Sequence, residues 1–126
     1  MMNAEVEKGL AQVCEHFADH TVDVEPDGQG GVFVTVHNVS VGGAYVPAET
    51  WLGFHISAAY PHADVYPHFI GVVQRADGAG HGPAVQHVDW RGRQALQLSR
   101  RSNRWNPAVD NVALKAEKVI AWFFTK

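Results

Sequence analysis

The segment from position 87 to position 99 contains a hydroxyl that could act as a nucleophile and two residues that could serve as its base. The hydroxyl of Ser99 can attack a carbonyl carbon, and His87 and Asp89 are the nearest residues along the chain that can accept its proton. Serine is a weak nucleophile unless such a base lies beside it. We therefore predict that Ser99, His87 and Asp89 form the catalytic group if the chain is an enzyme. In the alternative interpretation, Ser99 and Ser102 only hydrogen-bond a turn of a loop.

Basic residues are concentrated around this serine. Five of the ten basic residues lie between positions 91 and 104, whereas seven of the 13 acidic residues precede position 28. A charged patch of this kind steers the encounter with a partner of opposite charge, and arginine pairs with carboxylates through two hydrogen bonds. We predict that Arg100, Arg101, Arg104 and Trp105 bind an acidic partner. The alternative is a solvated loop that serves only the surface.

The composition narrows the class of protein and of partner. A chain of 126 residues with 46% apolar and 18% charged residues is typical of a single soluble globular domain, here residues 1–126. The net charge of -3 argues against a nucleic-acid partner, although Trp90 and Trp105 lie among the arginines. No apolar run approaches the roughly 20 residues of a membrane span, and the acidic start does not resemble a signal peptide. A lone cysteine, Cys14, fits the reducing cytoplasm.

Neither a metal site nor a cofactor is predicted. The histidines at positions 62, 68, 81 and 87 match no compact zinc pattern, and no cysteine accompanies them. The glycines of residues 78–82 do not follow the strand-to-helix pattern of a phosphate-binding loop. We expect surface imidazoles and a flexible segment at these positions.

The periodicity of apolar residues predicts the elements that position these side chains. Val6, Leu10, Val13 and Phe17 form one stripe of a helix over residues 3–19, and Cys14 beside the stripe is expected to be buried and unreactive. A turn at residues 26–31 precedes three strands that belong to an antiparallel meander. These strands are expected at residues 32–39, 50–56 and 69–73.

The second half of the chain combines an irregular segment with a helix. Residues 74–86 show no periodicity and are predicted to be a loop. Asn106 can cap a helix whose first residue is Pro107 and which ends near Phe124. The predicted fold class is therefore α+β: an N-terminal helix, an antiparallel meander of about four strands, a long irregular segment and a C-terminal helix.

Several short motifs resemble those of ubiquitin-conjugating enzymes in order and spacing, over roughly residues 4–124. His87-Val88-Asp89 stands where that family has His-Pro-Asn, and Trp105-Asn106-Pro107 supplies its Trp-x-Pro. Tyr60-Pro61, followed by Tyr66-Pro67, lies after the strand that carries Phe54 and Ile56. Both the histidine and the tryptophan place the family's catalytic cysteine at Gln97. The thioester chemistry of the family therefore cannot take place at its usual position.

The resemblance implies two alternative functions in a bacterial-type ubiquitin-like protein conjugation pathway. In the first, the chain is a transferase whose Ser99 carries the C-terminus of a ubiquitin-like protein as an oxyester, with His87 or Asp89 assisting. In the second, the domain is a catalytically inactive variant that binds or scaffolds its partner. The partners implied are a ubiquitin-like protein and its activating enzyme, and the surface near Trp122 and Phe124 is a further candidate for contact.

Overall fold

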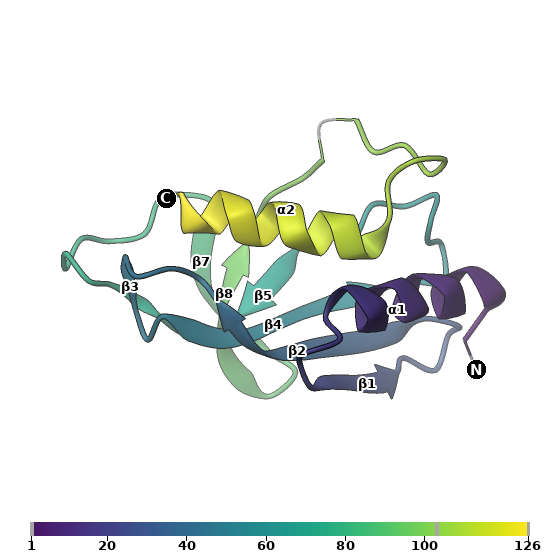
Figure 1. The fold of residues 1–126 in the computed structure, drawn as a ribbon, viewed down its shortest axis with the longest axis horizontal. Coiled ribbons are helices and arrows are strands. Elements are labelled where there is room, and N and C mark those ends of the chain that lie inside the picture. The colour runs from purple at the N-terminus through teal and green to yellow at the C-terminus, as the bar shows by residue number, and fades with distance from the viewer. Residues whose placement is uncertain (1, 103, 126) are drawn as a thin grey trace.

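A curved antiparallel sheet carries both helices on one of its faces (Figure 1). The structure is a computed structural model that describes residues 2–102 and 104–125. The elements are α1 (Ala4–His16), β1 (Val22–Pro26), β2 (Val32–Ser40), β3 (Tyr45–Val46), β4 (Glu49–Ile56), β5 (His68–Ile70), β6 (Gln74–Arg75), β7 (Val85–Trp90), β8 (Arg93–Leu98) and α2 (Val112–Phe124). The fold is therefore α+β, with a helix near each end of the chain, as the sequence predicts.

The main sheet has six strands in the order β1-β2-β4-β5-β8-β7, and every neighbouring pair is antiparallel. A separate two-stranded sheet pairs β3 with β6. The prediction of about four strands was too low for two reasons. It missed the exposed edge strand β1, and it treated the β7–β8 hairpin as part of an irregular segment.

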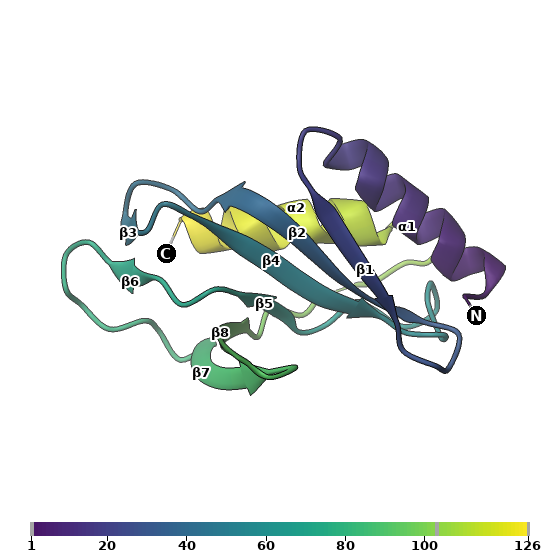
Figure 2. The same ribbon diagram turned by 90° about the horizontal axis from the view of Figure 1, so that it is seen from below.

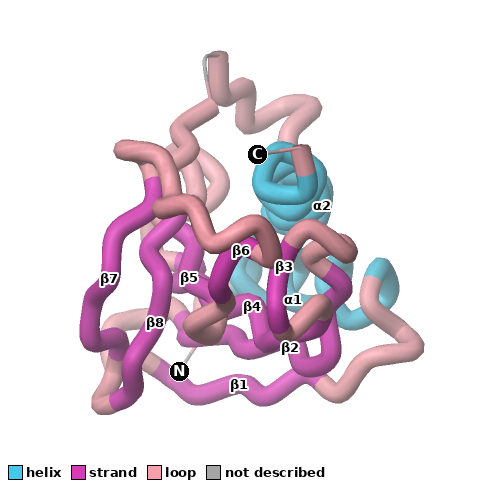
Figure 3. Tube along the Cα trace, turned by 90° about the vertical axis from the view of Figure 1, so that its left-hand side faces the viewer, coloured by secondary structure: helices cyan, strands magenta, loops and turns pink. Residues whose placement is uncertain are grey.

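The core lies between the sheet and the two helices. Alternate residues of β2 and β4, such as Val34, Val36, Leu52 and Phe54, are fully buried on the helix-facing side. Figure 2 shows α1 and α2 behind β1, β2 and β4, and Figure 3 shows the sheet curling from β1 to the hairpin. Both helices therefore cover one face of the sheet, while the tip of the β7–β8 hairpin curls toward the other face.

Helix α1 begins where the sequence predicts but ends three residues earlier. The Asn3 side chain accepts a hydrogen bond from the Val6 N–H and caps the helix. Val6 and Val13 are completely buried, whereas Cys14 is exposed, so the predicted burial of that thiol was wrong. Cys14 follows Val13 by one residue and is therefore turned by about 100° around the helix axis, away from the core.

Helix α2 begins at Val112, five residues after the predicted start. Asn106 does not cap it: the Asn106 side chain accepts from the Ala108 N–H and forms a local turn. Asn111 supplies the cap instead, because its side chain accepts from the Leu114 N–H. The Val112 N–H donates to the Tyr60 hydroxyl, which fixes the start of the helix against the 57–67 loop.

A second apolar cluster lies on the other face of the sheet and holds the β7–β8 hairpin in place. The Trp90 ring stacks on Phe69 at 4.7 Å between ring centres and on Trp51 at 5.7 Å. Gly53 leaves the space that Trp90 occupies, since a Cβ atom there would overlap the indole. Residues 85–98 are therefore an ordered strand pair, not the predicted irregular segment.

Candidate functional site

The register of the hairpin separates His87 and Asp89 from Ser99. His87 lies opposite Leu96, and the Ser99 N–H donates to the Ala84 carbonyl, which places Ser99 opposite Ala84. Residues directly opposite each other share a face, and successive residues alternate between faces. Ser99 therefore points to one face of the sheet while His87 and Asp89 point to the other. The separation of Ser99 from Leu96 along the strand adds roughly 10 Å.

Asp89 has a structural partner at the tip of the hairpin. Its Oδ1 accepts a hydrogen bond of 3.1 Å from the Gly92 N–H. Arg91 and Gly92 both have positive φ, 55° and 89°, as a type I′ turn between two antiparallel strands requires. The carboxylate thus stabilises a tight turn. The predicted group of Ser99, His87 and Asp89 is not brought together.

The side chains that do surround Ser99 are Gln97, Tyr66 and Arg101. Gln97 Nε2 donates to Ser99 Oγ at 3.3 Å. The Tyr66 oxygen accepts hydrogen bonds from Ser99 and from Arg101, and these bonds, the first more than the second, lower the pKa of the Tyr66 phenol below its usual range. The Arg101 guanidinium lies 4.7 Å from the centre of the same ring. The sequence gives no signal for Tyr66, because it lies far from Ser99 along the chain and only the fold brings it close.

Gln97, at the position where the resemblance places the cysteine, lies in an interior strand. It pairs with Phe69 of β5 on one side and with Gln86 of β7 on the other. Its side chain is half-buried and is used to orient Ser99. An amide has no nucleophilic chemistry, so the position provides hydrogen bonding only.

A basic pocket of about 470 Å³ lies between α2 and the segment that follows β8. Its cationic lining comes from Arg100, Arg101, Arg104, Lys115 and Lys118. The remaining lining residues are small, apolar or acidic: Ser102, Asp110, Val119 and Ala121. The predicted partner-binding arginines are thus brought together, and two lysines of α2, which no motif of the sequence indicates, join them.

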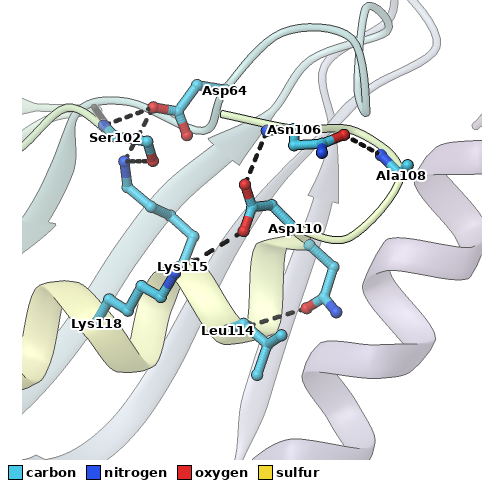
Figure 4. Close-up of polar contacts among 9 residues, drawn as sticks. Asp64, Ser102, Asn106, Ala108, Asp110, Leu114, Lys115 and Lys118 are labelled. Carbon is cyan, nitrogen blue, oxygen red and sulfur yellow. Dashed lines mark hydrogen bonds and ion pairs between the residues drawn. The ribbon is translucent and has the colours of Figure 1, made fainter. Parts of the chain in front are cut away.

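Lys115 anchors the floor of the basic pocket. Only 4% of its side chain is exposed, and its Nζ lies 2.9 Å from Asp64 Oδ2 and 2.7 Å from Ser102 Oγ. The same Asp64 oxygen accepts from the Ser102 N–H at 3.0 Å (Figure 4). One carboxylate therefore ties α2 and Ser102 to the 57–67 loop.

Asp110 gives the pocket wall its shape. Its Oδ2 accepts from the Asn106 N–H at 2.8 Å, and its Oδ1 lies 3.8 Å from Lys118 Nζ (Figure 4). Lys118 itself is largely exposed, so this ion pair is weak.

The three arginines of the basic pocket lack the carboxylate partners that Arg75 and Arg91 have. Arg91 pairs with Glu25 at 2.6 Å and Arg75 pairs with Asp77 at 2.8 Å. Within residues 2–102 and 104–125, no carboxylate pairs with Arg100, Arg101 or Arg104. Their positive charge is left for a partner or for solvent.

Trp105 has mainly an anchoring role. Its Nε1–H donates to the Pro61 carbonyl at 2.6 Å, and its half-buried ring packs against the core. The indole also lines a second cavity of about 310 Å³, together with Asp64, Tyr66, Arg101 and Ser102. The predicted partner-binding role of Trp105 is therefore limited to the part of the ring that faces this cavity.

Two of the four histidines at positions 62, 68, 81 and 87 have structural roles. His81 Nε2 lies 2.9 Å from the Val73 carbonyl, and His68 is completely buried in β5. In the described part of the chain, no three His, Cys, Asp or Glu side chains are grouped as metal ligands would be.

Acid is expected to destabilise the protein through His68. Burial, and then the nearby charge of Lys115, lower the pKa of His68 from 6.5 to about 3. The unfolded chain therefore binds a proton in this pH window that the folded protein does not, and stability falls as the pH drops below 6.5. The contribution reaches about 1.4 kcal/mol per pH unit. Chemical unfolding of a His68→Leu variant across this window should show a shallower pH dependence than the wild-type protein.

The comparison at neutral pH is the control for this variant. Leucine is similar in size to histidine and needs no hydrogen bond, whereas both ring nitrogens of His68 are buried without a partner in the described residues. The two proteins should therefore agree within about 1.5 kcal/mol when His68 is neutral. Identical slopes below pH 6.5 would show that His68 does not stay neutral in the folded state.

Comparison with known proteins provides no relative from which a function can be transferred. No protein-family model matches the chain, and no curated protein or solved structure matches it. Neither helix of the described chain has both the length and the apolar character needed to cross a membrane. A function must therefore be inferred from the geometry of the site and the motifs of the chain.

Proposed function

We propose that the chain is a ubiquitin-conjugating-like domain without a working nucleophile, which binds a ubiquitin-like protein or its activating enzyme in a bacterial-type, cytoplasmic conjugation pathway. Two motifs of the resemblance support this assignment because they meet in space. The Trp-x-Pro indole, Trp105, donates to the carbonyl of the Tyr-Pro proline, Pro61. The order of a first helix, an antiparallel sheet whose first four strands form a meander (β1-β2-β4-β5), and a final helix on the same face also agrees with it.

The surroundings of the reactive position favour binding over catalysis. Gln97 cannot form a thioester, and His87 and Asp89 lie on the opposite face from Ser99. A carboxylate such as Asp89 is also unsuited to stabilise a developing oxyanion, because the stabilising group must donate a hydrogen bond.

The observation that carries the binding proposal is the convergence of Arg100, Arg101 and Arg104 without carboxylate partners in the described residues. Uncompensated positive charge on one surface accelerates association with an acidic partner and selects against basic ones. The rest of the chain is acidic, with a net charge of -3, so this surface has the opposite sign from the molecule as a whole.

The proposal is tested by mixing the protein with a ubiquitin-like protein, the activating enzyme of the same organism and ATP. We expect a complex by size-exclusion chromatography and no covalent adduct. The combined Arg100→Gln, Arg101→Gln and Arg104→Gln variant should weaken the complex about tenfold or more, and added salt should weaken it further. Arg91→Gln, which removes one arginine from the hairpin, is the matched control. Absence of a complex with the wild-type protein would refute the proposal.

The contact between Tyr66 and Ser99 favours a second candidate function, an oxyester carrier. Ser99 Oγ would attack the carbonyl carbon of the thioester on the activating enzyme, and the carbon–sulfur bond would break as the thiolate leaves with its electron pair. The serine proton would pass to the Tyr66 oxygen when that phenol is ionised. The hydrogen bonds that this oxygen accepts from Ser99 and Arg101 lower its pKa and so favour the ionised form. In this version Tyr66 replaces His87 and Asp89 as the base.

The same reaction mixture distinguishes the two candidates. An adduct that resists thiols, is cleaved by base, disappears in Ser99→Ala and forms more slowly in Tyr66→Phe establishes the carrier. The absence of any adduct from a stable complex establishes the binding domain. A thiol-sensitive adduct on the exposed Cys14 would overturn both candidates.

A further inference from the structure

The basic pocket contains more positive charge than the protein itself neutralises. Of its five cationic side chains, Lys115 is paired with Asp64 at 2.9 Å and Lys118 lies 3.8 Å from Asp110. The guanidinium groups of Arg100, Arg101 and Arg104 have no carboxylate partner among residues 2–102 and 104–125. An anionic ligand in the pocket would therefore meet three cationic groups that no carboxylate of the described residues neutralises.

Two of these arginines are held in place by contacts that do not neutralise them. The Arg100 guanidinium lies 5.8 Å from the centre of the Trp122 ring, and the Arg101 guanidinium lies 4.7 Å from the centre of the Tyr66 ring. An aromatic face restricts the position of a guanidinium group. Arg101 also donates to the Tyr66 oxygen, and its remaining N–H donors stay available to a ligand. The pocket is thus organised before an anion arrives, which lowers the cost of binding.

The size of the pocket favours a small polyanion. A volume of about 470 Å³ lies within the range of about 300–1,000 Å³ for small-molecule sites. A single carboxylate would neutralise only one of the three free arginines, whereas a phosphate group presents three acceptor oxygens and up to about two charges. A chain of two or three phosphates offers more acceptor oxygens and more negative charge in a similarly small volume.

A neighbouring cavity offers room for an organic substituent on the phosphate. It measures about 310 Å³ and shares Arg101 and Ser102 with the basic pocket. Tyr66 and Trp105 supply aromatic surface to it, and Asp64 supplies a carboxylate. A ring attached to a phosphate in the basic pocket would meet aromatic surface here.

From this arrangement we infer that the basic pocket is a binding site for a phosphate-bearing small molecule. The charge comes from Arg100, Arg101 and Arg104, and the floor is the Lys115–Ser102 pair. The inference does not rest on the proposed role in conjugation, because it concerns the charge and volume of the pocket alone. A bound polyanion would compete with an acidic protein partner for the same arginines.

The test is isothermal titration calorimetry at constant ionic strength with two probes, sodium tripolyphosphate and adenosine triphosphate. We expect saturable binding with one site per chain. Arg101→Gln and Arg104→Gln should each weaken binding by about tenfold, the effect of losing one charge-assisted contact. Arg91→Gln should change it by less than about twofold, because Arg91 belongs to the hairpin turn and pairs with Glu25.

The two probes distinguish the source of the phosphate. Tighter binding of adenosine triphosphate places a ring in the neighbouring cavity and supports a phosphate ester, whereas equal binding supports recognition of the phosphates alone. Lack of saturable binding of both probes overturns the inference. An equal loss in Arg91→Gln overturns it as well, since the attraction would then be a property of the whole surface. Tighter binding of a hexaglutamate peptide than of either probe would assign the pocket to an acidic protein segment and overturn the phosphate site.

Discussion

Replacement of Lys115 by methionine is expected to lower the free energy of unfolding by about 3–5 kcal/mol, the usual cost of removing one partner from a buried ion pair. Lys115 is 4% exposed and Asp64 is 19% exposed, and one Asp64 oxygen is already buried without a hydrogen-bond partner in the described residues. Without the ammonium group, the Asp64 carboxylate is left in a poorly hydrated position. Urea unfolding monitored by circular dichroism measures the change.

The control for this prediction removes both charges. In the Asp64→Asn, Lys115→Met double variant, the asparagine can still accept the hydrogen bond from the Ser102 N–H, but no isolated charge remains. The double variant should therefore be more stable than Lys115→Met alone. Measuring Asp64→Asn as well completes the cycle that gives the interaction energy of the pair. A Lys115→Met protein within about 0.5 kcal/mol of wild type, the range typical of surface substitutions, would show that Lys115 is exposed in solution.

Neighbouring phenylalanines near the end of α2 are expected to respond very differently to truncation. Phe123 is completely buried, stacks on Tyr45 at 4.3 Å between ring centres, and accepts the Tyr45 hydroxyl at its backbone carbonyl. Phe123→Ala should lower the free energy of unfolding by about 3–5 kcal/mol. Phe124 is 54% exposed and touches the backbone near Gly42, so Phe124→Ala should cost less than about 1 kcal/mol.

This pair of variants tests the rotation of α2 about its axis, because the two residues differ only in the side of the helix on which they lie. Urea unfolding of both proteins under the same conditions gives the comparison directly. Equal losses, or a larger loss at position 124, would mean that α2 presents a different face to the sheet.

The sequence predicts the elements whose burial is one-sided and extended over several residues. The stripe of Val6, Val13 and Phe17 predicts α1 because only one side of that helix reaches the core. The alternation of Leu52, Phe54 and Ile56 predicts β4 because these three side chains face the core, whereas the burial of Gly53 beneath Trp90 on the other face leaves no such pattern. In both places the local pattern and the final packing agree, so no information from distant residues is required.

The two hydrogen-bonding roles of asparagine explain the wrong start of α2. Both Asn106 and Asn111 can cap a helix, and Pro107 after Asn106 makes the first position the more obvious choice. The helix begins at Val112 because the Val112 N–H donates to the hydroxyl of Tyr60, a residue far away in the sequence. A pattern within ten residues does not contain that contact.

The β7–β8 hairpin, which separates His87 and Asp89 from Ser99, was not predicted because apolar and polar residues do not alternate regularly along β7. β7 is an edge strand, and Gln86, His87 and Asp89 are all exposed although they do not share a face. The turn at Arg91-Gly92 is the one signal that was available. The grouping of Ser99 with Tyr66 depends on β5 and β8 being neighbours, which no local pattern indicates.

The arginines of the β7–β8 turn have a consequence for the behaviour of the protein at high concentration. Arg93 lies 3.8 Å from the centre of the Trp51 ring, and Arg91 lies 4.2 Å from that of Phe33. On a sheet whose helices cover only one side, these rings would otherwise form an adhesive patch. The guanidinium groups themselves lie over the rings, where Arg91 pairs with Glu25 and Arg93 donates to the Thr35 hydroxyl. Arg91 and Arg93 are therefore expected to limit self-association on this side of the sheet, which carries neither α1 nor α2.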